Sequence, residues 1–350
     1  MLFLQKALGE WLSMIKYPIL ERGATIGVTA PSSGVPSELH HLLKSAFKSV
    51  EKKGFNFICG ETAWTQDKEK SASAKKRAEE FNKMMLSDNI QLIIPPWGGE
   101  LLIETLEYID FENIKSKWIL GYSDISLLLL AITLKTGTAT AHGTNLVDLR
   151  GEYSDDTTAM WQTVSSTKMN ESILQHSSEK YQKEWQLDNP NPYIFNLTEQ
   201  TYWNSTAHEK VKIQGRLLGG CIDIIRHLIG TPYGNVQNFK ENYIEGDSVI
   251  WYLENLQLSP TELRRTLVQM KLAGWFEDCS GIMFGRSPAN PAVTNYTVED
   301  VYKELSKELR IPILYDIDCG HVPPQMTFIN GAFAEVESDN GQGTVLQTFK

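Results

Sequence analysis

The chain has 350 residues, of which 41% are hydrophobic and 22% are charged, and its formal net charge is −10 at pH 7. This is the composition of an ordinary globular protein, and the length allows two domains with a core each. The acidic balance argues against non-specific nucleic-acid binding, which needs a basic surface to release counterions. No apolar stretch reaches the roughly 20 residues needed to cross a bilayer, so neither nucleic acid nor a membrane is an expected partner.

The cysteines and the N-terminal segment indicate a cytoplasmic protein without a metal centre. The four cysteines are widely scattered and none forms a C-x-x-C pair, so neither a zinc site nor a redox motif is predicted. Free thiols in a reducing compartment are the expected state. Residues 1–13 are mildly apolar, but Lys6 and Glu10 interrupt them and no small-residue cleavage site is present, so we predict no signal peptide.

Strands and helices alternate along the first part of the chain. The patterns predict strands at 24–30, 55–59, 90–94, 118–121 and 139–142, and helices at 37–53, 71–87, 100–108 and 127–134. Such alternation implies an α/β fold with a parallel sheet covered on both faces. The ligand crevice of such a sheet lies at the carboxyl ends of its strands. Residues 31–34, residues 97–99, Ser123 and His142 all fall at those ends.

The remainder of the chain divides into a polar segment and a second folded region. Residues 151–210 are rich in Ser, Thr, Asn, Gln and Glu, with isolated tryptophans at Trp161, Trp185 and Trp203. We interpret this segment as a connector that covers the substrate rather than as core. Mixed strands and helices follow to the end. The predicted organisation is a nucleophile domain at 1–165, a connector at 166–210 and a C-terminal domain at 211–350.

Ser123 lies on a sharp strand-to-helix turn. The short apolar run Trp118-Ile-Leu-Gly121 ends in Tyr122-Ser-Asp124, and a helical run begins at once. A serine on such a turn is pushed out of the backbone and faces a helix N-terminus, where amide groups can stabilise the oxyanion formed when serine attacks a carbonyl. Ser123 is therefore the candidate nucleophile of a hydrolase.

A nucleophilic serine needs a base, and the base needs an orienting carboxylate. His321 follows a strand that breaks at a glycine, and the two prolines after it exclude a helix, so this histidine is held in a rigid loop. Glu254 ends an apolar strand and precedes a helix that opens with the capping-box residues Ser259 and Glu262. Taken alone, His321 is equally well explained as an incidental loop histidine. Glu254 is the weaker candidate, because a glutamate at a strand end is usually a surface residue.

Two glycine pairs lie where a hydrolase needs backbone amides. Gly98-Gly99 follows a buried strand and precedes a helix, so its N–H groups, with that of Asp124, are candidates for an oxyanion hole. Gly219-Gly220 precedes a predicted helix at 222–229, whose N-terminus is a candidate site for a substrate carboxylate. The alternative for both pairs is an ordinary tight turn, since glycine is the default where a positive φ is needed.

These segments, in this order, resemble the serine LD-carboxypeptidase family, which includes muramoyl-tetrapeptide carboxypeptidases and microcin C immunity proteins of the MccF type. The resemblance covers roughly residues 15–337. Any one motif is weak, but nine motifs in the right order make the match specific. The matching segments are Ile26-Gly-Val-Thr-Ala-Pro-Ser-Ser33, Gly98-Gly99, Gly121-Tyr-Ser-Asp124, His142-Gly143, Gly215-Arg-Leu-Leu-Gly-Gly220, Gly230-Thr-Pro-Tyr233, Leu253-Glu254, Gly285-Arg286 and Asp318-Cys-Gly-His321.

The resemblance implies a site and a fold. Ser123 would be the nucleophile, His321 the general base and Glu254 the orienting acid, with backbone N–H groups of Gly99 and Asp124 as the oxyanion hole. The fold would be a flavodoxin-like N-terminal domain joined to a smaller β-rich C-terminal domain, with the active site between them. A homodimer is expected, and neither a metal nor an organic cofactor is implied.

The resemblance leaves the substrate open between a murein tetrapeptide cut at an L–D bond and a peptidyl-nucleotide of the microcin C kind. The expected substrate contacts are Gly98, Glu100, Gly220 and Cys221. Cys221 stands where the family often has Asn, and Glu100 begins an atypical loop, so the departures concern the substrate rather than the chemistry. The three tryptophans of the polar segment favour the MccF-type branch, whose aromatic loop stacks on a nucleotide base.

Two other function classes stay open from the sequence. One is an amidase or esterase of another α/β type, and the other is a non-catalytic peptide- or sugar-binding module. A further expectation concerns the start of the chain, because the family pattern normally opens near Met14. Residues 1–13 would then be an extension, and Met14 the start used in the cell.

Overall fold

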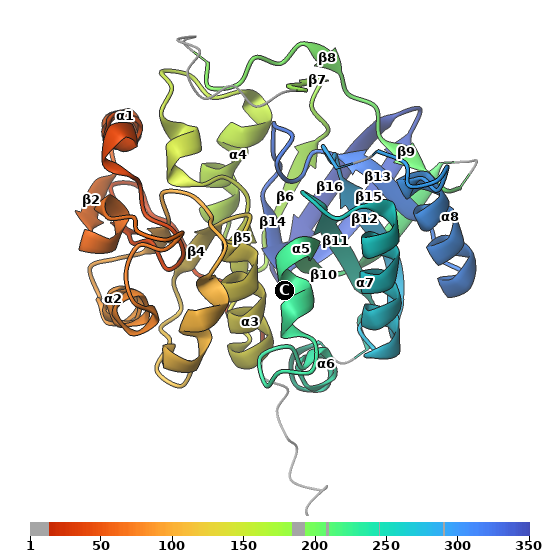
Figure 1. Cartoon of the computed structure of the whole chain (residues 1–350), viewed down its shortest axis with the longest axis horizontal. Helices are drawn as coiled ribbons and strands as arrows, with labels where there is room; N and C mark the ends of the chain where they lie inside the picture. Colours follow the sequence, from red (N-terminus) through yellow and green to blue (C-terminus); the bar gives the residue numbers. More distant parts are fainter. Residues whose placement is uncertain (1–13, 184–192, 208–209, 245, 290) are drawn as a thin grey trace, which may run out of the picture.

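The computed structural model describes residues 14–183, 193–207, 210–244, 246–289 and 291–350, so the predicted extension at 1–13 lies outside the described residues. Two sheets lie side by side, one built mainly from the N-terminal half of the chain and the other from the C-terminal half (Figure 1). Among the described helices, none has the length and apolarity to cross a bilayer.

The N-terminal sheet has six strands in the order β14-β5-β4-β3-β1-β2. The strands β1 to β5 are parallel, and their order is that of the flavodoxin-like doubly wound fold. The strand β14 comes from near the C-terminus and joins β5 in antiparallel orientation. The bounds are β1 Thr25–Val28, β2 Asn56–Cys59, β3 Leu92–Ile94, β4 Trp118–Gly121, β5 Thr140–His142 and β14 Phe328–Asn330.

Helices cover this sheet, the first three where the periodicity predicts them and the fourth in the polar segment, where no helix was predicted. They are α1 His40–Lys52, α2 Ala74–Leu86, α3 Ile125–Thr136 and α4 Asp156–Ser165, while the helix predicted at 100–108 is a 3₁₀ segment, η3 Leu102–Tyr108. Residues 125–134 of α3 are all buried, because this apolar helix packs between the N-terminal sheet and the second sheet (Figure 1). The turn at Ser123, which directly precedes α3, therefore lies at the junction of the two sheets.

The C-terminal sheet has eight strands in the order β6-β16-β15-β10-β11-β12-β13-β9. Its centre, β10 to β13, is parallel, and antiparallel strands flank it. The bounds are β6 Ser172–His176, β9 Asn204–Ser205, β10 Val211–Cys221, β11 Val249–Glu254, β12 Cys279–Gly285, β13 Ile313–Ile317, β15 Phe333–Asp339 and β16 Gln342–Thr348. The helices of this half are α5 Ile222–Ile225, α6 Val236–Tyr243, α7 Pro260–Leu272 and α8 Val298–Leu309, and a small pair, β7 Lys180–Tyr181 and β8 Glu199–Gln200, lies apart. The predicted α/β fold, with a parallel N-terminal sheet and a separate mixed sheet, is confirmed.

The interpretation of the tryptophans at 161 and 203 as parts of a substrate-covering loop is wrong. Trp161 lies on α4, is 1% exposed and packs against Phe55 at 5.8 Å between ring centroids. Trp203 is 2% exposed, and its indole N–H donates to Asp318 at 2.9 Å. The prediction failed because the polar composition of this segment is typical of a loop, whereas two of its strands, β6 and β9, join the C-terminal sheet. Trp185 lies outside the described residues.

Candidate active site

Ser123 lies on the turn between β4 and α3. Its φ is +64°, in the left-handed region that non-glycine residues seldom adopt. Such backbone strain is concentrated at functional sites. Residue 121, just before the turn, has to be a glycine because its neighbours lie very close. A Cβ on Gly121 would lie 2.9 Å from Oδ1 of Asn145 and from the side chain of Ile125. The turn thus projects the serine hydroxyl away from the end of the strand.

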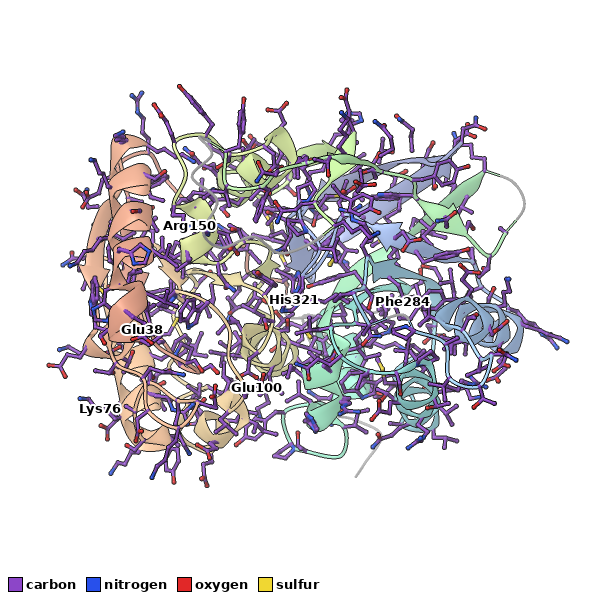
Figure 2. The ribbon with its side chains drawn as sticks, turned by 45° about the horizontal axis from the view of Figure 1, so that its top comes forward. Glu38, Lys76, Glu100, Arg150, Phe284 and His321 are labelled. Atoms are coloured by element: carbon purple, nitrogen blue, oxygen red, sulfur yellow. The ribbon has the colours of Figure 1, made fainter. Side chains whose placement is uncertain are left out.

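Ser123, His321 and Glu254 form one hydrogen-bonded chain. The distance from Oγ of Ser123 to Nε2 of His321 is 3.0 Å. Nδ1 of His321 is 2.7 Å from Oε2 of Glu254, and the same oxygen accepts the main-chain N–H of His321 at 3.0 Å. Glu254 comes from the end of β11 and His321 from the loop after β13. Figure 2 shows His321 near the centre of the molecule, between the two halves of the ribbon.

The electrostatics of this chain keep the glutamate ionised. Burial acts to raise the pKa of Glu254, but His321 and the neighbouring His142 outweigh burial and hold that pKa well below its usual range. Burial acts to lower the pKa of His321, but the charge and hydrogen bond of Glu254 outweigh it, so the pKa of His321 lies above its ordinary value. An anionic carboxylate against an imidazole is the arrangement that orients a general base and stabilises its protonated form.

The loop of Gly98 and Gly99 packs directly against Ser123. A Cβ on Gly98 would lie 2.6 Å from Cβ and 2.7 Å from Oγ of Ser123, and 3.2 Å from the amide nitrogen of Asp124. Gly99 has a φ of +147°, and a Cβ there would collide with the hydroxyls of Ser32 and Ser33. Among the described residues, no acceptor is bonded to the amides of Gly99 and Asp124. These amides are therefore available to an oxyanion beside Ser123.

The carboxylate of Asp124 holds this loop in place. Its Oδ2 accepts the hydroxyl of Ser32 at 2.5 Å and the amide of Leu102 at 2.9 Å. The side chain is 1% exposed, and burial raises the pKa of this carboxyl against the effect of those two donors. Asp124, which directly follows Ser123, therefore holds the loop after β1 and the loop after β3 through its carboxylate.

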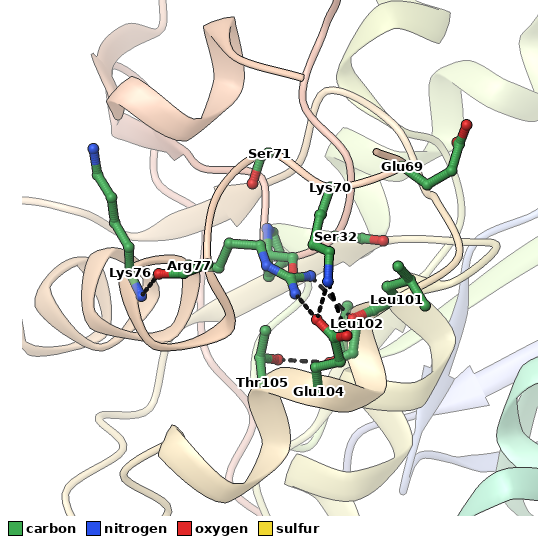
Figure 3. A network of polar contacts seen from close by, with 12 residues as sticks. Ser32, Glu69, Lys70, Ser71, Lys76, Arg77, Leu101, Leu102, Glu104 and Thr105 are labelled. Carbon is green, nitrogen blue, oxygen red and sulfur yellow. Dashed lines mark hydrogen bonds and ion pairs between the residues drawn. The ribbon is translucent and has the colours of Figure 1, made fainter. Parts of the chain in front are cut away.

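A second polar network anchors the same loops from behind (Figure 3). The fully buried guanidinium of Arg77 donates to the carbonyls of Pro31 and Leu101, both at 3.0 Å. It also bonds Glu104 at 2.7 Å, and Nζ of Lys70 contacts both oxygens of that carboxylate at 3.0 Å. The loop that carries Gly99 is thus tied to the loop after β1 before any substrate binds.

The loop of His321 is anchored by Asp318, which is fully buried. Oδ1 of Asp318 accepts Arg286 at 2.7 Å and the hydroxyl of Ser178 at 2.5 Å. Its Oδ2 accepts the amide of Ser178 at 3.0 Å and the indole N–H of Trp203 at 2.9 Å. Ser178 and Trp203 of the polar segment therefore hold the loop of His321 in position, a role that the sequence did not indicate.

The remaining predicted site residues differ in their surroundings. Glu100 is exposed and borders a cavity of ≈ 360 Å³ that Asp124 and Asp223 also line. Burial and the charges of Asp124, Glu69 and Asp223 raise the pKa of Glu100. Gly219 and Gly220 lie inside β10, and the helix that follows, α5, has only four residues. Cys221 is 1% exposed, and its amide donates to Ser126 at 3.0 Å.

Sequence reasoning placed His142 at a strand end but gave it no role in the site. The side chain is fully buried, and its Nε2 is 3.7 Å from Oε1 of Glu254, on the side of the carboxylate opposite His321. The sequence feature that could have suggested a role for His142 is its position at the carboxyl end of β5, because β5 lies next to β4, the strand that leads to Ser123.

Family models match both halves of the chain. The model described as LD-carboxypeptidase N-terminal domain matches residues 26–143, and the model described as LD-carboxypeptidase C-terminal domain matches residues 214–336. A putative carboxypeptidase of Vibrio cholerae is 27% identical over 93% of this chain and 96% of its own length. The microcin C7 self-immunity protein MccF of Escherichia coli is 25% identical over 93% and 94%. A probable murein peptide carboxypeptidase of Bacillus subtilis is 25% identical over 91% and 90%.

Solved structures share the fold. MccF in complex with aspartyl sulfamoyl adenosine superposes with a TM-score of 0.80 at 22% identity, covering 96% of this chain and 99% of that structure. The muramoyltetrapeptide carboxypeptidase from Oxalobacter formigenes gives a TM-score of 0.70 at 19% identity, with 93% and 99% covered. The two-sheet architecture is therefore common to both branches.

Proposed function

The chain belongs to the LD-carboxypeptidase family, and from this premise we propose that it is a serine carboxypeptidase in which Ser123 is the nucleophile, His321 the general base and Glu254 the orienting acid. The observation that carries the proposal is the unbroken chain of contacts from Oγ of Ser123 through His321 to Glu254, at 3.0 and 2.7 Å. A nucleophile within hydrogen-bond reach of a base that a third group orients is the arrangement required for covalent catalysis.

In the first half of the reaction, Oγ of Ser123 forms a bond to the carbonyl carbon of the substrate amide while Nε2 of His321 takes the hydroxyl proton. The carbonyl oxygen becomes an oxyanion, for which the amides of Gly99 and Asp124 are the donors. His321 then gives its proton to the amide nitrogen, the C–N bond breaks, and the amine leaves. Preorganised amide donors of this kind contribute on the order of 10²–10³ in rate each.

In the second half, water hydrolyses the acyl-enzyme. His321 takes a proton from the water, whose oxygen forms a bond to the acyl carbon. The bond to Ser123 then breaks, and the serine recovers its proton from His321. Glu254 stays ionised throughout, since its role is to orient and stabilise the imidazolium.

The substrate that we propose is a murein tetrapeptide, cut at the L–D bond so that D-alanine is released. The similarity to a murein peptide carboxypeptidase over nine-tenths of both chains supports this choice. Of the four residues expected to contact substrate, Gly98 faces the nucleophile and Glu100 is exposed beside it. Gly220 and Cys221 are buried, so Glu100 is the side chain that we expect to contact the peptide.

A second candidate is hydrolysis of a peptidyl- or aminoacyl-nucleotide of the microcin C kind. It is supported by one observation, that the chain is 25% identical to MccF over 93% of its own length and 94% of that protein. The experiment that separates the two candidates is mass spectrometry of products from a tetrapeptide muropeptide and a peptidyl-adenylate analogue, incubated side by side with the protein. Release of D-alanine is expected, and cleavage of the nucleotide alone would replace the first candidate by the second.

The chemistry itself is tested with a fluorophosphonate probe, which reacts only with an activated serine. We expect labelling of Ser123, and loss of labelling in Ser123→Ala and in His321→Ala. Absence of labelling in the wild-type protein would favour a non-catalytic binding module. Labelling without cleavage of either substrate would favour an amidase or esterase of another specificity. The homodimer and the cytoplasmic location expected from the resemblance stay predictions.

A further inference from the structure

One buried contact beside the candidate triad is incomplete. Nε2 of His142 and Oε1 of Glu254 face each other at 3.7 Å, and neither atom has a hydrogen-bond partner within the described part of the chain. The side chains of His142 and Glu254 are 0% and 1% exposed. An unpaired buried carboxylate oxygen is strongly unfavourable. The observed distance exceeds a hydrogen bond by about half an ångström, and catalytic hydrogen bonds are often long before substrate binds.

The opposite edge of the His142 ring faces a thiol, which favours one tautomer of the ring. Nδ1 of His142 lies 3.9 Å from Sγ of Cys319, two residues before His321. Burial, followed by the charge of Glu254, raises the pKa of Cys319 well above its ordinary value, and a thiol that keeps its proton can donate weakly to Nδ1. Nδ1 is then the acceptor, and the ring proton is on Nε2, directed at Oε1 of Glu254.

We propose that His142 is a positioning residue that holds the free oxygen of Glu254 and thereby fixes the orientation of His321 against Ser123. His142 belongs to β5 of the N-terminal sheet, whereas Glu254 ends β11 of the C-terminal sheet. The carboxylate thus lies between two histidines, one at the end of β5 and one in the loop between β13 and β14. The proposal rests on the proposed function, because it presumes that Ser123 is the nucleophile.

The surroundings of His142 restrict its ring. The ring of Tyr252 lies 5.3 Å from it and that of Tyr122 6.5 Å, and Tyr122 also packs on His321 at 5.0 Å. The ring of His142 is thus fully buried between two aromatic rings. The polar contact of His142 with the triad is made to Glu254, at 3.7 Å.

Two matched substitutions separate positioning from packing. In His142→Gln the side-chain amide reaches the place of Nε2, so a donor to Glu254 is retained. In His142→Asn the amide reaches only the place of Nδ1, so the contact with Glu254 is lost while a polar group of similar kind remains. Both variants lose the ring, and a purely structural role would therefore affect them alike.

The measurement is the second-order rate constant for fluorophosphonate labelling of Ser123 between pH 5 and pH 9, with thermal unfolding as the check on folding. We expect His142→Asn to label about 10- to 100-fold more slowly, because a displacement of about 1 Å in a catalytic group has effects of that size. We expect His142→Gln to label close to the wild-type rate. In His142→Asn the acid limb moves to higher pH, since a carboxylate with one donor fewer binds the imidazolium more strongly.

The wild-type protein and the two His142 variants share all other titratable groups near the triad. A difference between the pH profiles of the three proteins therefore reports on His142. The groups that act on His321 or Glu254 are Glu100, Tyr122, Asp148, Cys221, Asp223 and Cys319. Equal labelling rates and equal pH profiles for the Asn and Gln variants would overturn the proposal. Wild-type protein that does not label at Ser123 would instead refute the proposed function.

A measurement on the wild-type protein covers the case in which neither variant folds. Nitrogen-15 NMR of histidine-labelled protein distinguishes the two neutral tautomers through their couplings to ring protons. We expect His142 to carry its proton on Nε2. A proton on Nδ1 would leave no donor facing Glu254 and would overturn the proposal.

Discussion

The substitution Gly98→Ala tests the placement of the loop beside the nucleophile. The added methyl group would lie 2.6 Å from Cβ and 2.7 Å from Oγ of Ser123. Carbon atoms in ordinary contact are about 3.5–4.0 Å apart, so the overlap is about 1 Å. Ser123 cannot yield, because its φ of +64° and its contact with His321 fix the side chain. The loop must therefore move away and carry the amide of Gly99 with it.

The expected effect on reactivity is much larger than the effect on folding. A shift of about 1 Å in an oxyanion donor corresponds to a loss of about 100-fold in rate. Overpacking by one methyl group in a well-packed region typically destabilises by about 1–3 kcal/mol. We therefore expect Gly98→Ala to fold, to melt at a moderately lower temperature, and to label with the fluorophosphonate about 100-fold more slowly than the wild-type protein.

A matched control is Gly281→Ala in β12. Its methyl group would lie 2.6 Å from Cδ1 of Ile213, an equally close approach, but to the end of a flexible side chain far along the chain from the nucleophile. We expect a comparable or smaller loss of thermal stability and a labelling rate equal to that of the wild-type protein. Wild-type labelling in folded Gly98→Ala, or slow labelling in Gly281→Ala, would refute the placement of the loop.

Three further predictions concern pH and stability. Because Glu254 raises the pKa of His321, we expect labelling of wild-type protein to fall as the pH drops through a midpoint above about 6.5. Burial raises the pKa of Asp148 to about 6. Between pH 4 and pH 6 the folded protein therefore keeps a proton on Asp148 that the unfolded chain has lost. Because the folded state binds more protons, the free energy of unfolding falls as the pH rises through this range. We expect Asp148→Asn to gain about 2–3 kcal/mol relative to the wild-type protein at pH 7.5 and nothing near pH 4, in denaturant titrations. Trp203→Phe removes the indole donor to buried Asp318, and we expect about 1.5–3 kcal/mol of destabilisation in the same assay.

The nucleophile turn could be predicted from sequence because its determinants are local. An apolar run of strand length, a glycine, and a helical run directly afterwards define β4, the turn at Ser123 and α3 within about twenty residues. The parallel sheet follows from the same kind of local periodicity, and the structure has the strands where the pattern predicts them. Glu254 and His321 could be located at strand ends, but their pairing with Ser123 was expected from family resemblance, since no local pattern relates them.

The buried tryptophans and His142 could not be predicted because their surroundings are set by pairing between distant strands. Trp203 has polar neighbours in the sequence, yet it is covered because β9 joins β13 and because Asp318 accepts its N–H. His142 faces Glu254 only because α3 packs the N-terminal sheet against β10, whose neighbour β11 carries Glu254. Residues 142 and 254 share no periodicity or motif, so the contact depends on how the two sheets meet.

The distance between nucleophile and base depends on the strand that the C-terminal part contributes to the N-terminal sheet. The loop of His321 begins at the end of β13, in the C-terminal sheet, and ends at β14, in the N-terminal sheet. Phe328 of β14 pairs directly with His142 of β5, and Gly121 at the end of β4 pairs with His142 on the other side. The base loop is thus attached at one end to the strand next to the one that leads to Ser123. A relative movement of the two sheets would have to break the pairing of β14 with β5 before it could separate Ser123 from His321. The strand β14, together with the contact between His142 and Glu254, therefore keeps the residues of the site close together although they come from both sheets.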